Sequence, residues 1–455
     1  MLSASSINKH SALFVLTLFV FSNLLAQENS PYSRYGIGEE YANQHVATKS
    51  YGGITTTYAD GQAINVSNPA SYGSIALVTY DLGFAIDRRT LRLANPVDKY
   101  TSTNFIPNYV ILGIPLSRGK GWGMALGFRP VTRVNYSIVD TTQPPIGGTT
   151  RLQTLYEGNG GMNEFFWGLG KRFKNSLSIG FNVGVDFGRK QTNTRTAPVD
   201  SVYFYKGNRA TTTTYRGLFL NGGLQYDIKL KKKEDKIKNT TSTLLMRVGA
   251  FGTLGNTLNA ETDVLTETFE YDQSGGVRTI DTIEYQQAED GKIKLPQTVR
   301  GGLSFIKKIS DGFSTYDKWS VAVEYNKAQW SDYRFYGAKD ELINNHMFRT
   351  GASLTPNNPF SDKSMFARST YRVGFYTGKD FINADGNELK VFAFTAGFGF
   401  NIRKRRSFDN QFTLINTSFE WGKRGSNVNN ITESFFRFSV GLSLSDVWFI
   451  KRKYE

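Results

Sequence analysis

Cysteine is absent from this sequence of 455 residues, and only three histidines and twelve prolines occur. Without cysteine, the chain cannot form a disulfide scaffold, a cysteine zinc site, an iron–sulfur cluster or a cysteine nucleophile. Past residue 26 the sequence contains only His45 and His346. Two histidines so far apart in sequence provide little basis for a Ser/His catalytic pair or a histidine metal site. We therefore expect no enzyme, no metal ion and no cofactor.

Long apolar runs are also missing. Past residue 26, no run approaches the roughly 18 residues of a membrane-spanning helix. The sequence instead contains 45 glycines and 14% aromatic residues, a composition typical of β structure. The formal net charge is +15, but the basic residues cluster in predicted turns rather than along one groove, so we expect no nucleic-acid partner.

The first 26 residues predict a secretory signal peptide. Lys9 precedes an apolar stretch at residues 12–21, and the small residue Ala26 is followed by a polar sequence. A basic start, a short apolar core and a small residue at the end are the features of a cleaved export signal. We expect cleavage after Ala26 and export from the cytoplasm.

The remaining chain shows a period of two over long stretches. Between residues 177 and 188, six large apolar residues alternate with small or polar ones. This pattern predicts a strand with one apolar face, and its length suits a tilted strand that crosses a bilayer better than a strand of a soluble sandwich. About fourteen segments show this signal, near 76–87, 104–116, 120–138, 162–173, 176–193, 209–229, 242–259, 294–308, 318–335, 345–355, 368–378, 388–402, 410–421 and 433–450.

The connections support the same interpretation. Short turns such as 174–175 alternate with longer segments such as 260–293, as the periplasmic turns and outer loops of bacterial barrels do. The basic clusters fall at the predicted periplasmic ends, where they form either a rim against anionic lipid headgroups or a collar for a partner. We predict an all-β protein, a transmembrane barrel of about fourteen antiparallel strands in the outer membrane, with outer-membrane lipids as partners.

Residues 27–75 do not alternate. A barrel of fourteen strands has a lumen too wide for side chains alone to fill. We therefore predict three regions: a signal peptide at 1–26, an N-terminal plug or hatch at 27–75 and the transmembrane barrel at 76–455. The alternative for 27–75 is a flexible periplasmic tail.

The sequence Asn68-Pro69-Ala70, preceded by Ala59-Asp60-Gly61, resembles the hatch of the outer-membrane hydrophobic-compound transporter family (FadL/TodX-like). The plug-like start and the strand number resemble the same family. The resemblance implies passive uptake of fatty-acid-like or aromatic small molecules through a plugged lumen. The ending at 448–455 resembles barrel ends from Bacteroidetes-type envelopes, where some barrels of this type serve secretion or assembly complexes. The alternative function is therefore a non-transporting accessory subunit, with other outer-membrane proteins as partners.

Two sets of residues are candidates for a site. The alternation places ionisable residues of both signs, among them Asp81 and Glu324, on the lumen side. Because arginine binds carboxylates with two parallel hydrogen bonds, we expect the ligand, if it is acidic, at Arg247, Arg349 and Arg372. Arg129-Pro130 interrupts the strand at 120–138 and predicts a bulge. In the family that the chain resembles, a kink in the third strand opens the wall laterally, so these two residues are the candidate lateral gate.

Overall fold

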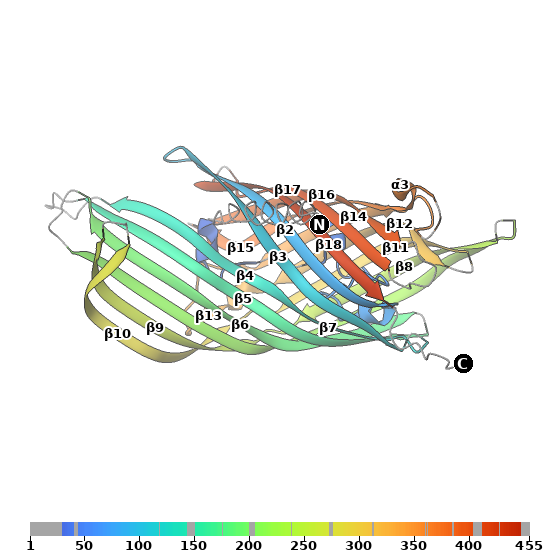
Figure 1. Ribbon diagram of the computed structural model, residues 1–455, viewed down its shortest axis with the longest axis horizontal. Helices are drawn as coiled ribbons and strands as arrows, with labels where there is room; N and C mark the ends of the chain where they lie inside the picture. The colour runs from blue at the N-terminus through green and yellow to red at the C-terminus, as the bar shows by residue number, and fades with distance from the viewer. Residues whose placement is uncertain are drawn as a thin grey trace, which may run out of the picture.

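Fourteen long antiparallel strands close into a barrel in the computed structural model (Figure 1). They follow one another around the wall in chain order, and the last strand pairs with the first. The strands of the barrel wall are β2 (Val78–Leu93), β3 (Asp98–Ser117), β4 (Trp122–Thr142), β5 (Leu152–Phe173), β6 (Leu177–Pro198), β7 (Lys206–Asp235), β8 (Thr240–Thr253), β11 (Thr298–Ser310), β12 (Thr315–Ala328), β14 (Asn345–Leu354), β15 (Thr370–Ala384), β16 (Asn387–Arg403), β17 (Phe412–Arg424) and β18 (Ile431–Asp446).

The structure describes residues 30–446 except 41–43, 118, 143–150, 175, 200–204, 238, 273–275, 312–313, 360, 362, 385, 404–411 and 427. The predicted signal peptide and the chain end at 448–455 lie outside the described residues. Each of the fourteen segments predicted from the alternation corresponds to one strand of the wall, so the prediction of a barrel is confirmed.

The two faces of each strand differ as the alternation predicts. On β6, the apolar side chains of Ile179, Val183 and Phe187 point outward and are 48%, 37% and 39% exposed. Asn182 and Asp186, which alternate with them, are buried on the lumen side. An outward apolar face is what a strand needs when it lies against hydrocarbon.

One hairpin extends the wall beyond the barrel. The predicted outer segment 260–293 falls within two strands, β9 (Thr257–Tyr271) and β10 (Val277–Lys294). The first part of β7 pairs with β9, and its last part pairs with β8. The β9–β10 hairpin, which we call the arm, therefore projects from one end of the barrel, and the β7–β8 turn lies at the other end (Figure 1).

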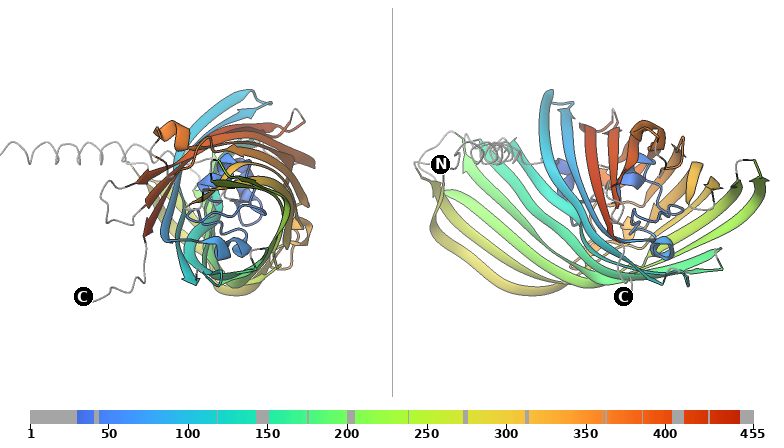
Figure 2. Two further views of the ribbon diagram at one scale, coloured as in Figure 1. Left: turned by 90° about the vertical axis from the view of Figure 1, so that its right-hand side faces the viewer. Right: turned by 45° about the vertical axis from the view of Figure 1, so that its right-hand side comes forward.

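The remaining elements are short. Residues 30–75, which we call the N-terminal segment, contain η1 (Pro31–Arg34), β1 (Glu39–Glu40), α2 (Val46–Ser50) and η2 (Pro69–Ser74), and these four elements lie inside the barrel (Figure 2). Other short elements are η3 (Trp330–Asp332), β13 (Arg334–Phe335) and α3 (Met365–Arg368). Among the described residues, none of the helices has the length and apolar character needed to span a membrane.

The outward face of β6 gives a test of membrane embedding. Val183→Arg should lower the free energy of unfolding by about 2–4 kcal/mol, because it places a charge at the middle of the lipid-facing band. Gln191→Arg, on the same face but beyond Phe187 and next to the natural Arg189, should cost at most about 1 kcal/mol. Urea unfolding in phospholipid vesicles measures both variants, and equal losses would show that this face does not contact hydrocarbon.

Asn182, the inward neighbour of Val183, is not a neutral control. Its side-chain amide donates to the Val66 carbonyl at 3.0 Å, and its Oδ1 accepts from the Tyr72 hydroxyl at 2.9 Å. A substitution at this inward position would therefore also disrupt contacts with the N-terminal segment.

Candidate functional site

The N-terminal segment packs closely against the inner face of β4 to β7. Ile54, Ile64 and Tyr72 of this segment are almost completely buried. The glycines of the facing strands make this approach possible: a Cβ at Gly180 would overlap the Pro69 carbonyl, and one at Gly223 would overlap the Asn68 side chain. The small residues of the alternating pattern therefore form the surface on which η2 rests.

Asn68, Pro69 and Ala70 form the beginning of η2. Asn68 Oδ1 accepts a hydrogen bond from the Ala70 amide at 3.1 Å and so caps the helix. Pro69 occupies the first helical position, where no backbone donor is needed. Asn68 Nδ2 donates to the Thr56 carbonyl at 2.7 Å, which ties two parts of the N-terminal segment together.

A histidine and an aspartate join the N-terminal segment to β2. His45 caps α2, because its Nδ1 accepts from the Ala47 amide at 3.0 Å. Its Nε2 lies 2.8 Å from Asp81 Oδ2, and both side chains are fully buried. The Asp81 carboxylate also accepts from the Ile64 amide and from the Ser443 hydroxyl, both at 3.2 Å. One inward carboxylate thus bonds to two parts of the N-terminal segment and to β18.

Glu39 of β1, which is partly buried, belongs to a network of ion pairs with buried arginines. Its carboxylate lies 2.7 Å from Arg89 and 2.6 Å from Arg424, on two strands of the wall. Arg424 also contacts Asp380 at 2.7 Å and Glu433 at 3.3 Å. Burial alone raises the pKa of Glu39, but the charges of Arg89 and Arg424 outweigh burial and hold the pKa below its ordinary value. The folded state therefore gains stability from this group above its ordinary pKa and loses it as the pH falls through the lowered pKa.

Glu324 of β12 forms a second attachment point. Its Oε2 accepts hydrogen bonds from the backbone amides of Thr55 at 2.7 Å and Thr56 at 2.8 Å. Its Oε1 lies 3.7 Å from Arg300 and 3.6 Å from Arg349. Backbone donors and two guanidinium groups thus share one carboxylate.

The described residues form two large cavities in the lumen besides a smaller pocket, and the N-terminal segment contributes to the walls of both. The first holds about 350 Å³ and the second about 530 Å³. The first is lined by seven basic and seven acidic side chains, among them Glu39, Arg300 and Arg424. Ligand sites for apolar compounds are mostly lined by hydrophobic and aromatic side chains. The first cavity differs from that pattern because its apolar side chains, such as Phe251 and Phe435, alternate with many charged ones whose signs balance.

The three arginines proposed for a ligand carboxylate do not come together. Arg349 lines the first cavity, whereas Arg247 and Arg372 line the second. Arg247 is already occupied, since its Nε and Nη2 lie 2.5 and 2.9 Å from the two oxygens of Asp227. Arg372 donates to Asn416 Oδ1 at 3.1 Å. A ligand role of these residues stays a prediction.

The wall contains a seam between β3 and β4. Their pairing runs from Ser117 opposite Trp122 to Val110 opposite Phe128 and stops there. Beyond that point β3 pairs only with β2 on its other side, and β4 continues along β5. Pro130 lies two residues beyond Phe128 and at a shift in the β4–β5 register, so the predicted bulge is present. Arg129 is paired with Glu164, at 2.7 Å.

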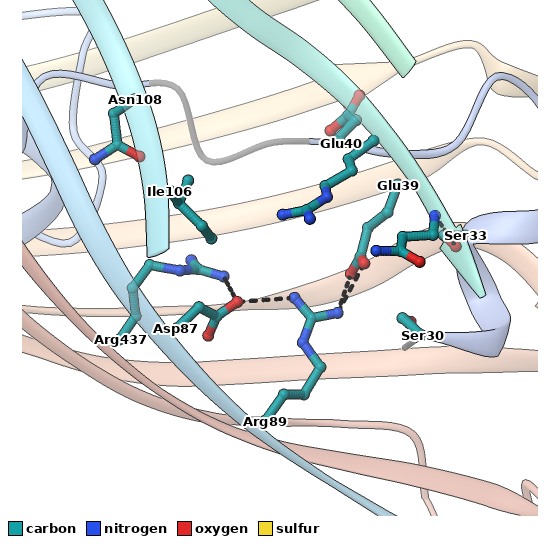
Figure 3. A pocket seen from close by; sticks show the side chains of 11 residues that line it. Ser30, Ser33, Glu39, Glu40, Asp87, Arg89, Ile106, Asn108 and Arg437 are labelled. Carbon is teal, nitrogen blue, oxygen red and sulfur yellow. Dashed lines mark hydrogen bonds and ion pairs between the residues drawn. The ribbon is translucent and has the colours of Figure 1, made fainter. Parts of the chain in front are cut away.

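The N-terminal segment covers the seam from inside. β1 pairs with β4 at Thr132 and Arg133, and the Ser30 amide donates to the Asn135 carbonyl at 3.1 Å. A small pocket of about 20 Å³ remains there, with Ile106 and Asn108 of β3 on one side. Figure 3 shows a row of charged side chains across it, running from Arg437 through Asp87 and Arg89 to Glu39.

The sequence alone indicated some of these groups and missed others. Asp81 and Glu324 are inward by alternation, and the structure adds the backbone amides that they bind. Glu39 and Asp380 carried no signal, because Glu39 lies in a segment without periodicity and Asp380 lies in a predicted connection. Their negative charge was the single property in the sequence that could have identified Glu39 and Asp380 as members of the site.

Glu324 gives a test of how the N-terminal segment is held. Glu324→Gln should lower the free energy of unfolding by about 3 kcal/mol or more, because Arg300 and Arg349 lose a fully buried counter-charge. The N-terminal segment should also become accessible to protease. Urea unfolding and limited proteolysis of the folded barrel measure the two effects.

The matched control is Glu388→Gln. Glu388 pairs with Lys379 at 2.6 Å, but both side chains are more than 40% exposed. Its loss should cost no more than about 1 kcal/mol. If Glu324→Gln behaves like this surface variant, the carboxylate does not hold the segment.

Comparisons with known proteins identify a matching family model and solved structures with the same fold. A family model named BamG matches residues 7–455. The chain is similar to the toluene transporter TodX of Pseudomonas putida, with 16% identity over 90% of this chain and 99% of that chain and a TM-score of 0.53. It is also similar to the toluene transporter TbuX of Ralstonia pickettii, with 14% identity over 88% and 98% of the chains and a TM-score of 0.52. The chain is similar as well to a FadL homologue of Pseudomonas aeruginosa, with 11% identity over 91% of this chain and 100% of that chain and a TM-score of 0.50. A search of the curated proteins gives no match.

Proposed function

The chain belongs to the BamG family, and we propose that it is a non-transporting, structural subunit of an outer-membrane secretion or assembly complex. Its barrel has the fold of outer-membrane hydrophobic-compound transporters. At the identities observed, that likeness concerns the fold and leaves the activity open.

The observation that carries this proposal is the charged, occupied lumen. The N-terminal segment is held to the wall by the ion pairs of the partly buried Glu39 with two buried arginines and by the backbone bonds to Glu324. An apolar solute would have to cross the first cavity, whose fourteen charged side chains are seven basic and seven acidic. Removing these groups from their partners to admit an apolar molecule is costly, because unpaired buried charges are strongly unfavourable.

We further propose that residues 27–75 act as a permanent plug, with Asn68, Pro69 and Ala70 forming its base. A plug of this kind keeps the outer membrane sealed while the outside of the barrel contacts other proteins. The predicted signal peptide at 1–26 and the outward apolar band suit export to the cell outer membrane, where the barrel contacts lipids.

A disulfide between the plug and the wall distinguishes a static plug from a moving one. A Cβ built at Gly441 lies 3.1 Å from Val46 Cβ, close to the ~3.5–4.5 Å of disulfides. The double variant Val46→Cys/Gly441→Cys should therefore link α2 to β18, and the chain has no cysteine of its own to interfere. We expect cells that carry the oxidised variant to grow normally and to keep the same outer-membrane complex after gentle solubilisation.

The two single-cysteine variants are the controls for this experiment. Loss of function only in the oxidised double variant, restored by a reductant, would contradict a static plug. Recovery of the wild-type protein alone, without stoichiometric partners, would contradict the role as a subunit.

A second candidate function is uptake of hydrophobic small molecules, and the seam favours it. The wall is unpaired between β3 and β4 beyond Phe128, next to Arg129 and Pro130. The same residues form the candidate lateral gate, and the arginines Arg247, Arg349 and Arg372 would then bind the acidic end of a fatty-acid-like ligand. The polar lining of the seam pocket argues against this function.

Pro130→Val tests the second candidate. Valine restores a backbone donor, which adds about 0.5–1.5 kcal/mol at most, so the barrel should still fold and show heat-modifiable migration. If the seam releases an apolar solute to the bilayer, uptake of radiolabelled toluene should fall. For the structural subunit, wild type and variant should take up toluene at the same rate as cells that lack the protein.

A further inference from the structure

The arm differs in charge from the rest of the chain. Residues 257–294 contain nine acidic and three basic residues, a net charge of −6, whereas the whole chain has a net charge of +15. The β7–β8 turn at the opposite end of the barrel is rich in lysine. The acidic surface is therefore a local feature of the arm.

The arm is fixed to the barrel at its base. β9 pairs with β7 from Arg216 opposite Asn259 to Lys206 opposite Phe269. The Tyr336 amide donates to the Lys292 carbonyl at 3.0 Å, and the Tyr336 hydroxyl donates to the Glu289 carbonyl at 2.9 Å. The acidic side chains are thus presented on a supported hairpin.

The outer strand of the arm is exposed over most of its length. All residues from Val277 to Asp290 are exposed, and Ile283 and Tyr285 are 65% and 56% exposed. Asp281, Glu284 and Asp290 have no basic side chain within ion-pair distance among the described residues. The ion pair found within the described part of the arm is Arg278 with Glu270, at 3.2 Å. The outer strand thus presents several carboxylates that have no basic partner among the described residues, and large apolar side chains lie between them.

Three occupants are less compatible with this surface. A bound metal ion is disfavoured because no group of three or more acidic or histidine side chains in the described residues is arranged to hold one. Addition of a partner strand is disfavoured because β10 has three register shifts between Thr279 and Glu289, which break the regular edge. A second copy in the same membrane would hold its lysine-rich β7–β8 turn at the opposite end, away from the arm.

We propose that the outer face of the arm, around Ile283, docks a basic surface of another protein through side-chain contacts. The docked surface carries several Lys or Arg residues beside an apolar patch, because the acidic residues are spread along the strand and surround Ile283 and Tyr285. This inference rests on the proposed function, since it names one contact of the complex. Opposite charges on the two surfaces speed association and select the partner.

The experiment uses the full-length protein in its native membrane. A photoreactive p-benzoylphenylalanine replaces Ile283, and the protein crosslinked to it is identified together with the crosslinked segment. We expect one partner protein, contacted at a segment of net positive charge. The crosslink yield should fall at least tenfold between about 0.05 and 0.5 M salt, because exposed charges are screened.

Charge neutralisation gives the matched comparison. Asp281→Asn, Glu284→Gln, Glu289→Gln and Asp290→Asn together should reduce the crosslink yield at least tenfold at about 0.15 M salt. The control replaces Lys231, Lys232, Lys233 and Lys236 at the opposite end by Gln and should leave the yield unchanged. Heat-modifiable migration shows that each variant is folded.

The outcomes separate this inference from the function. Crosslinks only to lipopolysaccharide, to a second copy or to an acidic surface would overturn the docking proposal, as would an unchanged yield in the neutralised variant. If the complex still co-purifies in those cases, the structural role stands without this contact. If the wild-type protein purifies alone, the role as a subunit fails as well.

Discussion

The ion pairs and hydrogen bonds between the N-terminal segment and the inner face of the barrel are the interactions on which the rest of the structure depends. A wall of fourteen strands encloses more space than its own side chains fill. Here the described residues of the segment 30–75 enter that space. Their backbone amides and the Glu39 carboxylate bind charged groups of the wall. Without this filling, inward groups such as Glu324 and Arg424 would be exposed to a wide aqueous channel.

This filling also explains the composition of the strands. The inner face of β4 to β7 is rich in glycine because η2 lies directly on it, as the close approach at Gly180 and Gly223 shows. The outer face is apolar because it borders lipid. The alternation of the sequence thus reflects two surroundings: the apolar residues face the bilayer, and the small residues face the packed N-terminal segment.

The seam, the lumen and the arm all bear on function. A barrel that shares its fold with toluene transporters here has a polar pocket at its seam and a cavity lined by charges of both signs within. The shared fold leaves the activity open at these identities, and we base the proposed structural role on these features. In the role that we propose, the functional surfaces lie on the outside of the barrel, where the acidic arm projects.

The sequence by itself determined the fourteen strands, the direction of their faces and the presence of a segment that does not belong to the wall. A period of two is a local property, so it can be read without knowing which strands become neighbours. It also placed Asp81 and Glu324 inward and predicted the bulge at Pro130. Only the tertiary structure decided which charges meet. Glu39 and Arg424 are 385 positions apart, and their contact depends on the closure of the barrel and on the path of the N-terminal segment within it.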